Sequence, residues 1–190
     1  MEVSYPVLDQ LTVFIVQHQS NDIQRLHLGD KQPFHSRPYL HRYFITPLPV
    51  PTSQQATIFL QVASSSSIQV PVTLWQADTF VAQELKTTLF HGAYFGALLL
   101  LIVCNLLLYA SMSERSYLYY VIWAFSIGLF SAALDGWAFQ YLWPNATDWN
   151  DQVIVISLAL IIIFGGLSSQ GYLKLSNWSR IYDWLYISLL

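Results

Sequence analysis

The densest group of side chains that could bind a ligand lies in HSRPYLHR, residues 35–42. Along an extended chain every second side chain points to the same side. Four residues would then share one side of this segment: His35, Arg37, Tyr39 and His41. A guanidinium can bind a carboxylate or phosphate through two hydrogen bonds, and aromatic rings can stack on a sugar. We therefore expect the segment to border a small-molecule site, with Arg37 removable without loss of stability and Trp75 as a further stacking surface.

Other interpretations of these residues stay open. The segment could be a solvated loop in which Arg37 and Arg42 are structural, and Trp75 could pack in the core or against a linker. Two histidines of the segment could bind a metal ion, but no cysteine or third ligand is near them in the sequence, so we expect no metal. The apolar segments contain serines but, apart from His91 at the very edge of the first, no histidine or aspartate to activate them, so we expect neither an enzyme nor a cofactor.

Composition indicates the kind of fold that carries this segment. The chain is 54% hydrophobic and only 10% charged, whereas soluble domains contain roughly 25% charged residues. A helix that crosses about 30 Å of hydrocarbon needs roughly 20 apolar residues. Such runs lie at residues 90–112, 117–134 and 153–172, and a fourth begins at 184–190 and stops at the chain end. We therefore expect an α-helical transmembrane bundle over residues 90–190, in contact with a lipid bilayer.

Basic residues predict the orientation of this bundle, because cytoplasmic loops are enriched in Lys and Arg. Arg115 lies in the turn after the first span, and Lys174 and Arg180 follow the third span. The intervening segment, residues 135–152, contains no Lys or Arg. These three residues should therefore anchor the cytoplasmic side, with the N-terminal part of the chain outside the membrane.

The N-terminal part has the pattern of a β-domain. Short runs rich in β-branched and aromatic residues predict strands at residues 10–17, 56–64 and 68–75. We expect an all-β, jelly-roll-like sandwich over residues 1–77. Four or five strands are few for a closed sandwich, so we expect the domain to be incomplete, as we do the bundle. Asp78 should cap a linking helix over residues 78–89 that runs into the first span.

Small and polar residues within the spans indicate how helices pack. Gly92 and Gly96 would let another helix approach closely, either inside the bundle or in a homodimer. Asn105 is the one amide deep in the first span, and we expect it to bond to another helix. Small residues around Gly165 and Gly171 should mark the buried face of the third span.

Several motifs carry a resemblance to a known family. In the membrane part they are Gly92, Tyr94, Gly96, Asn105, Tyr109, the turn that begins at Arg115, Gly136, and the run Gln140-Tyr141-Leu142-Trp143-Pro144. In the N-terminal part they are Gly29-Asp30, Pro33-Phe34, Arg37-Pro38, residues 44–48 and Leu74-Trp75. The chain resembles the bacterial seven-transmembrane receptors with diverse intracellular signalling modules, and its N-terminal part resembles the later part of their type-2 extracellular sensor domain, a jelly-roll similar to carbohydrate-binding modules.

The resemblance implies a multi-pass receptor of the bacterial inner membrane with a periplasmic N-terminal domain. Such a receptor would bind a small ligand, for example one like a carbohydrate, and relay the signal to a cytoplasmic cyclase or kinase. A non-catalytic scaffold or assembly subunit is the alternative. A transporter is disfavoured because ionisable residues are confined to loops and span edges. The net charge of -3 and the lack of a basic run argue against nucleic acid.

Overall fold

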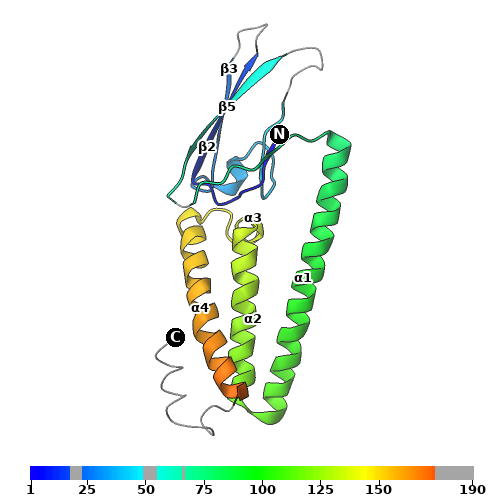
Figure 1. The fold of residues 1–190 in the computed structure, drawn as a ribbon, viewed down its shortest axis with the longest axis vertical. Helices are drawn as coiled ribbons and strands as arrows, with labels where there is room; N and C mark the ends of the chain where they lie inside the picture. Colours follow the sequence, from blue (N-terminus) through cyan, green and yellow to red (C-terminus); the bar gives the residue numbers. More distant parts are fainter. Residues whose placement is uncertain (18–22, 49–54, 66, 174–190) are drawn as a thin grey trace. The chain divides into compact units, whose positions relative to one another are not determined.

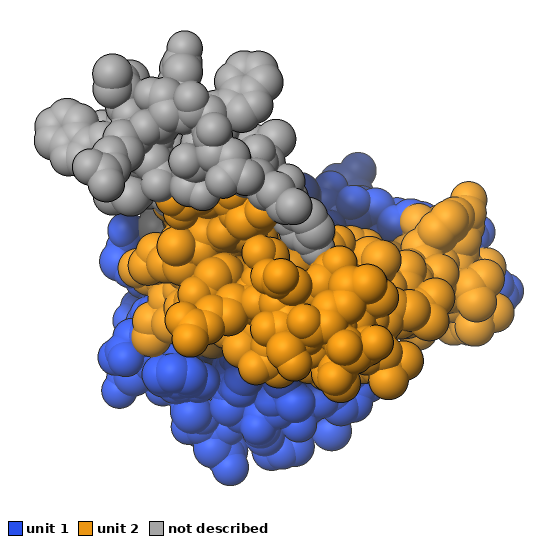
Figure 2. Space-filling model, turned by 90° about the horizontal axis from the view of Figure 1, so that it is seen from below, with its two compact units in different colours: residues 1–80, 132–152 blue, residues 81–131, 153–190 orange. Residues whose placement is uncertain are grey.

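A computed structural model describes residues 1–17, 23–48, 55–65 and 67–173 (Figure 1). The elements follow in this order: β1 (Glu2–Val3), β2 (Gln10–Gln17), β3 (Ile23–Leu28), the 3₁₀ turn η1 (Phe34–Ser36), β4 (Phe44–Ile45), β5 (Ala56–Ala63), β6 (Val72–Thr73), α1 (Ala77–Met112), α2 (Arg115–Leu134), α3 (Trp137–Tyr141) and α4 (Thr147–Leu173). They form two compact units, distinguished by colour in Figure 2. The strand unit contains Met1–Phe80 and Ala132–Gln152, and the helix unit contains Val81–Ser131 and the described chain from Val153 onward.

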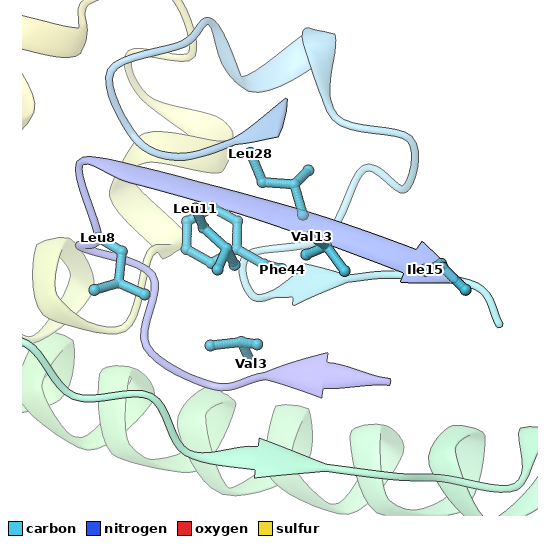
Figure 3. Close-up of a cluster of buried hydrophobic side chains, with 7 residues drawn as sticks. All are labelled: Val3, Leu8, Leu11, Val13, Ile15, Leu28 and Phe44. Atoms are coloured by element: carbon cyan, nitrogen blue, oxygen red, sulfur yellow. The ribbon is translucent and has the colours of Figure 1, made fainter. Parts of the chain in front are cut away.

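The described residues of the strand unit form two three-stranded antiparallel sheets, in the orders β4-β1-β6 and β3-β2-β5. The alternation predicted for β2 is confirmed, with Leu11, Val13 and Ile15 buried on one face. These side chains meet residues of the other sheet in one core, shown in Figure 3: Val3, Leu8, Leu11, Val13, Ile15, Leu28 and Phe44. Burying an apolar side chain of this size contributes about 1.5–3 kcal/mol, so the core holds the sheets together. The predicted β-domain is confirmed, and a closed jelly-roll stays a prediction.

The last predicted strand is shorter than expected. The sequence pattern predicts a strand over residues 68–75, but β6 covers only two residues. Pro71 immediately precedes β6, and its carbonyl accepts a hydrogen bond from the Ser4 amide at 3.2 Å. Because proline has no N–H of its own, it cannot donate to a strand ladder. Regular pairing therefore begins only after it.

The segment between α2 and α4 folds with the strands, although the sequence places it in the membrane domain. Gly136 has a φ of 77° and begins α3. A methyl group at Gly136 would lie 2.9 Å from Pro6 Cβ and 3.2 Å from the Arg42 carbonyl oxygen. The position therefore needs glycine for its backbone angle and for the close approach. Nearby, the Phe34 amide donates to the Pro144 carbonyl at 2.8 Å, so backbone contacts hold this segment within the strand unit.

Among the described residues, three helices are long and apolar enough to cross a membrane: Ala77–Met112, Arg115–Leu134 and Thr147–Gly171. The predicted linking helix and first span are one continuous helix, α1, of 36 residues. At 1.5 Å per residue it is roughly 54 Å long, well beyond the hydrocarbon thickness of about 30 Å. Arg115 is the first residue of α2. The predicted fourth span at 184–190, and the predicted anchors Lys174 and Arg180, lie outside the described residues.

Close helix contacts with described residues are found at glycines of α4, and not at Gly92 and Gly96 of α1, where the sequence predicts them. A methyl group on Gly165 would lie 2.9 Å from Trp123 Nε1, and one on Gly171 would lie 2.1 Å from Ser116 Oγ. This supports the small-residue face predicted for the third span. At Gly92 and Gly96, nothing described lies within 4 Å of such a methyl group. A close helix contact at these two residues therefore stays a prediction.

Asn105 does not make the expected bond to a neighbouring helix through its amide nitrogen. Its Nδ2 donates to the Leu101 carbonyl of the same helix, at 2.9 Å. A polar link between helices is found instead between Tyr94 and Ser131, whose hydroxyl oxygens lie 3.1 Å apart. In the described part of the unit, α1 and α2 are thus joined by hydroxyl groups.

We predict that Gly165→Ala destabilises the helix unit, because its methyl group must displace the rigid indole of Trp123. Overpacking of this kind costs about 1–3 kcal/mol. Gly96→Ala is the matched control, since it makes the same change on a helix where a methyl group meets open space. Thermal unfolding in detergent should show a lower melting temperature for the first variant and no loss for the second. Equal losses in both would contradict the packing described and would indicate an additional close contact at Gly96.

Candidate functional site in the strand unit

The segment predicted to bind a ligand is not extended. Its start lies in the 3₁₀ turn η1, and Arg37 then adopts an extended conformation. Arg37 is only 6% exposed, whereas Tyr39 is 53% exposed and His35 is also exposed. The expectation that these alternate side chains share one side is therefore wrong, because it required an unbroken extended chain.

Arg37 is surrounded by aromatic rings. Its guanidinium carbon lies 4.7 Å from the ring centre of Phe34, 4.6 Å from that of Phe44 and 5.5 Å from that of Phe139. Its Nη1 donates to the carbonyl oxygens of His41 and Arg42, each at 2.9 Å. Burial lowers the pKa of Arg37 to about 10, against the opposing effect of the Asp30 charge. The side chain thus stays protonated at neutral pH, as an internal cation that holds the turn together.

Arg42 forms a second contact of the same kind. It is 1% exposed, and its guanidinium carbon lies 4.6 Å from the ring centre of Tyr43 and 4.5 Å from that of Trp137. Trp137 in turn stacks on Tyr141 within α3, with the ring centres 5.8 Å apart. Cation–π contacts contribute about 0.5–1 kcal/mol at exposed sites and about 2 kcal/mol when desolvated. Two buried arginines therefore connect the segment around residues 37–42 to α3.

Two more of the residues predicted to bind ligand, His41 and Trp75, contact other parts of the strand unit. The His41 ring lies 5.7 Å from the ring of Phe80, in the first turn of α1, and 5.6 Å from that of Tyr43. The Trp75 indole N–H donates to the Glu2 carboxylate. The structure thus brings Arg37, His41 and Arg42 together, and Trp75 bonds instead to β1. Ligand binding by these residues stays a prediction.

Three carboxylates that the sequence analysis missed meet elsewhere in the strand unit. Asp9, Asp30 and Asp151 each offer an oxygen within 4.8 Å of the other two. Asp9 Oδ2 accepts hydrogen bonds from the amide and the hydroxyl of Ser65, both at 2.7 Å. The Lys31 ammonium pairs with the Asp151 carboxylate. No local motif could reveal this cluster, because its members come from three separate parts of the chain.

The carboxylates differ in their electrostatic surroundings. Burial raises the pKa of Asp30 to about 6, helped by the charges of Asp151 and Asp9 and opposed by Lys31. Burial also acts to raise the pKa of Asp9, but the hydrogen bonds from Ser65 and the charge of Lys31 outweigh it, so this pKa is lowered. The charged form of Asp30, the most buried of the three, is therefore disfavoured relative to that of Asp9.

We predict that Arg37→Ala lowers the stability of the strand unit, contrary to the expectation from the sequence. The change removes two charge-assisted hydrogen bonds and the contacts with three rings, for a net loss of about 2–3 kcal/mol. Arg37→Lys should lose most of this stability as well, because an ammonium lacks the planar fork. Thermal unfolding of the full chain in nanodiscs measures both effects.

Arg25→Ala is the matched control for Arg37. Arg25 also covers a ring, that of Phe14 at 5.3 Å, but it is exposed. Its removal should change stability by less than about 0.5 kcal/mol. A melting temperature for Arg37→Ala equal to that of the control would show that the buried arginine is not structural.

Comparison with known proteins identifies the family. The family model described as 7TM diverse intracellular signalling matches residues 87–190. The model described as 7TMR-DISM extracellular 2 matches residues 1–76. No curated protein and no solved structure matches the chain significantly. The chain belongs to the seven-transmembrane receptors with diverse intracellular signalling modules, with an extracellular domain of the second type followed by helices of the membrane domain.

Proposed function

We propose that the strand unit senses a small extracytoplasmic molecule and that the helices relay its binding to a cytoplasmic signalling module of the cyclase or kinase class. Membership of a receptor family and an extracellular domain ahead of membrane-spanning helices support this function. The observation that carries it is the route by which the strand unit is joined to the membrane helices.

This route begins at the segment around residues 37–42. Arg37 contacts Phe139 and Arg42 contacts Trp137, and both rings belong to α3. α3 is the short helix between α2 and α4, so a shift of these rings acts on the ends of two membrane helices. Moving the aromatic rings away from a buried guanidinium would cost free energy, because the charge would lose the contacts that replace its hydration. We therefore expect the two arginines and α3 to move together.

A second connection leads to α1. The His41 ring contacts Phe80 in the first turn of α1, and only residues 74–76 separate β6 from this helix. α1 continues as one helix from this first turn through its predicted span. The same segment thus contacts both α3 and the first turn of α1.

The ligand surface should involve the exposed side chains of this segment. Tyr39 is 53% exposed and Leu40 is 60% exposed, which suits stacking on the apolar face of a sugar-like molecule. In this proposal Arg37 and Arg42 transmit the signal and do not touch the ligand. A ligand changes the receptor only if it binds one conformation of the segment more tightly than the other.

Hydrogen exchange of the full chain in nanodiscs tests this proposal. A panel of mono- and oligosaccharides is first screened by thermal shift, since a ligand at a hundredfold its Kd stabilises by about 2.7 kcal/mol. With a sugar that raises the melting temperature, we expect exchange to change together at residues 37–44, in α3 and in the first turns of α1. Tyr39→Ala should abolish the thermal shift.

Trp137→Leu tests the relay. In this variant the ligand should still alter hydrogen exchange at residues 37–44 but should no longer alter it in α3. A ligand effect confined to the strands of the unmodified chain would contradict the relay. If no sugar of the panel shifts the melting temperature, sugar sensing is contradicted and the scaffold alternative is favoured.

A further inference from the structure

We propose that Asp9, Asp30 and Asp151 bind one divalent cation, and that this cation is Ca²⁺. Their nearest oxygens all lie within 4.8 Å of one another. Ca²⁺ binds oxygens at 2.3–2.6 Å, so two oxygens on opposite sides of the ion are roughly 4.6–5.2 Å apart. One ion can therefore reach all three carboxylates without a rearrangement of the backbone.

A second observation points to a ligand at this place. Asp30 is 1% exposed, and its Oδ1 has no hydrogen-bond partner among the described residues. Its other oxygen, Oδ2, accepts a long bond of 3.5 Å from Asn150 Nδ2. A buried acceptor without a partner is destabilising by about 1–3 kcal/mol, and more when it is charged. A cation between the carboxylates would satisfy Oδ1, which Lys31 does not, because its ammonium pairs with Asp151.

Backbone contacts hold Asp9 and Asp30 close together before any cation binds. Gly29 has a φ of 150°, and a methyl group on it would lie 2.2 Å from the Asp9 carbonyl oxygen. The Asp30 amide donates to the Leu8 carbonyl at 2.9 Å. The chain around Asp30 is therefore pressed against the chain around Asp9. The third carboxylate, Asp151, comes from the part of α4 that belongs to the strand unit.

The chemistry of the donors selects the metal. All three are carboxylates, which suit Ca²⁺ or Mg²⁺, while Zn²⁺ prefers His and Cys. Mg²⁺ requires a near-ideal octahedron and shorter bonds, whereas Ca²⁺ accepts irregular oxygen sets with additional waters. Three carboxylates against the one ammonium of Lys31 leave a net negative site. Because Lys31 competes for Asp151, we expect the millimolar range typical of extracellular modules, a Kd of about 10⁻⁴–10⁻³ M.

Such a cation would join the turns before β2 and after β3 to the beginning of α4. It would make the stability of the strand unit dependent on extracytoplasmic Ca²⁺. This inference does not rest on sugar sensing, because none of the three carboxylates belongs to the 37–42 segment.

The experiment uses the full chain in nanodiscs after treatment with a chelator. Calorimetric titration with CaCl₂ should show saturable binding, and MgCl₂ should bind at least tenfold more weakly. Tb³⁺, a luminescent substitute for Ca²⁺, offers a second readout through Trp143. The indole of Trp143 donates to Asn150 Oδ1 at 3.1 Å, and Asn150 bonds to Asp30. Excited Trp143 should therefore sensitise bound Tb³⁺, and Ca²⁺ should displace it.

Variants separate this site from general binding by acidic residues. Asp30→Asn and Asp151→Asn should each weaken Ca²⁺ binding at least tenfold, and the second is partly exposed, so its folding is less at risk. Asp148→Asn is the matched control, because it removes the same charge from the same helix outside the cluster. Lys31→Met should strengthen binding by removing the competitor.

The proposal is overturned if neither the unmodified chain nor Lys31→Met shows saturable Ca²⁺ binding up to about 10 mM, ten times the upper limit of the expected range. Equal weakening by Asp148→Asn and Asp151→Asn would also overturn it, since it would show diffuse attraction to a negative surface.

Discussion

Two arginines buried under aromatic rings are the constraint on which the strand unit depends. A charged side chain removed from water must recover its lost hydration from hydrogen bonds, opposite charges or ring faces. Arg37 does so with two carbonyl oxygens and three rings, and Arg42 with two rings. One of the rings around each arginine belongs to α3. The strands and the segment between α2 and α4 therefore stabilise each other, and neither arginine is fully covered without α3.

This constraint agrees with the topology of a family receptor. The extracellular domain and the segment between the second and third described helices must lie on the same side of the membrane if they fold as one unit. The distribution of charge also places residues 135–152 on the side opposite the cytoplasm. This segment contains no Lys or Arg, whereas Arg115 lies at the beginning of α2. Gly136 is required where the two parts approach closely, beside Pro6 and the Arg42 carbonyl. Packing thus places the two parts on the same side of the membrane, and charge indicates that this side is not the cytoplasmic one.

Features with a local physical cause could be predicted from the sequence. The membrane spans follow from apolar length, and β2 follows from its alternation. The site could be predicted only in part, because its contacts join distant segments: Asp30 and Asn150, for example, are separated by 120 positions. The prediction that alternate side chains around Arg37 share one side was wrong for a local reason. It assumed an extended chain with alternating side chains, whereas the turn η1 changes the direction of the chain just before Arg37. The role of α3 was missed because a run of aromatic residues beside a span also suits the membrane interface.

The contact between Arg42 and Trp137 tests the central claim most directly, because it joins the two parts of the strand unit. A double-mutant cycle combines Arg42→Met and Trp137→Leu, and hydrogen exchange of the β2 amides measures the free energy of opening. We expect a coupling of about 1–2 kcal/mol, the range of a desolvated cation–π contact. Effects that add to within about 0.3 kcal/mol, as those of independent sites do, would contradict the claim that this contact holds the strands and α3 together.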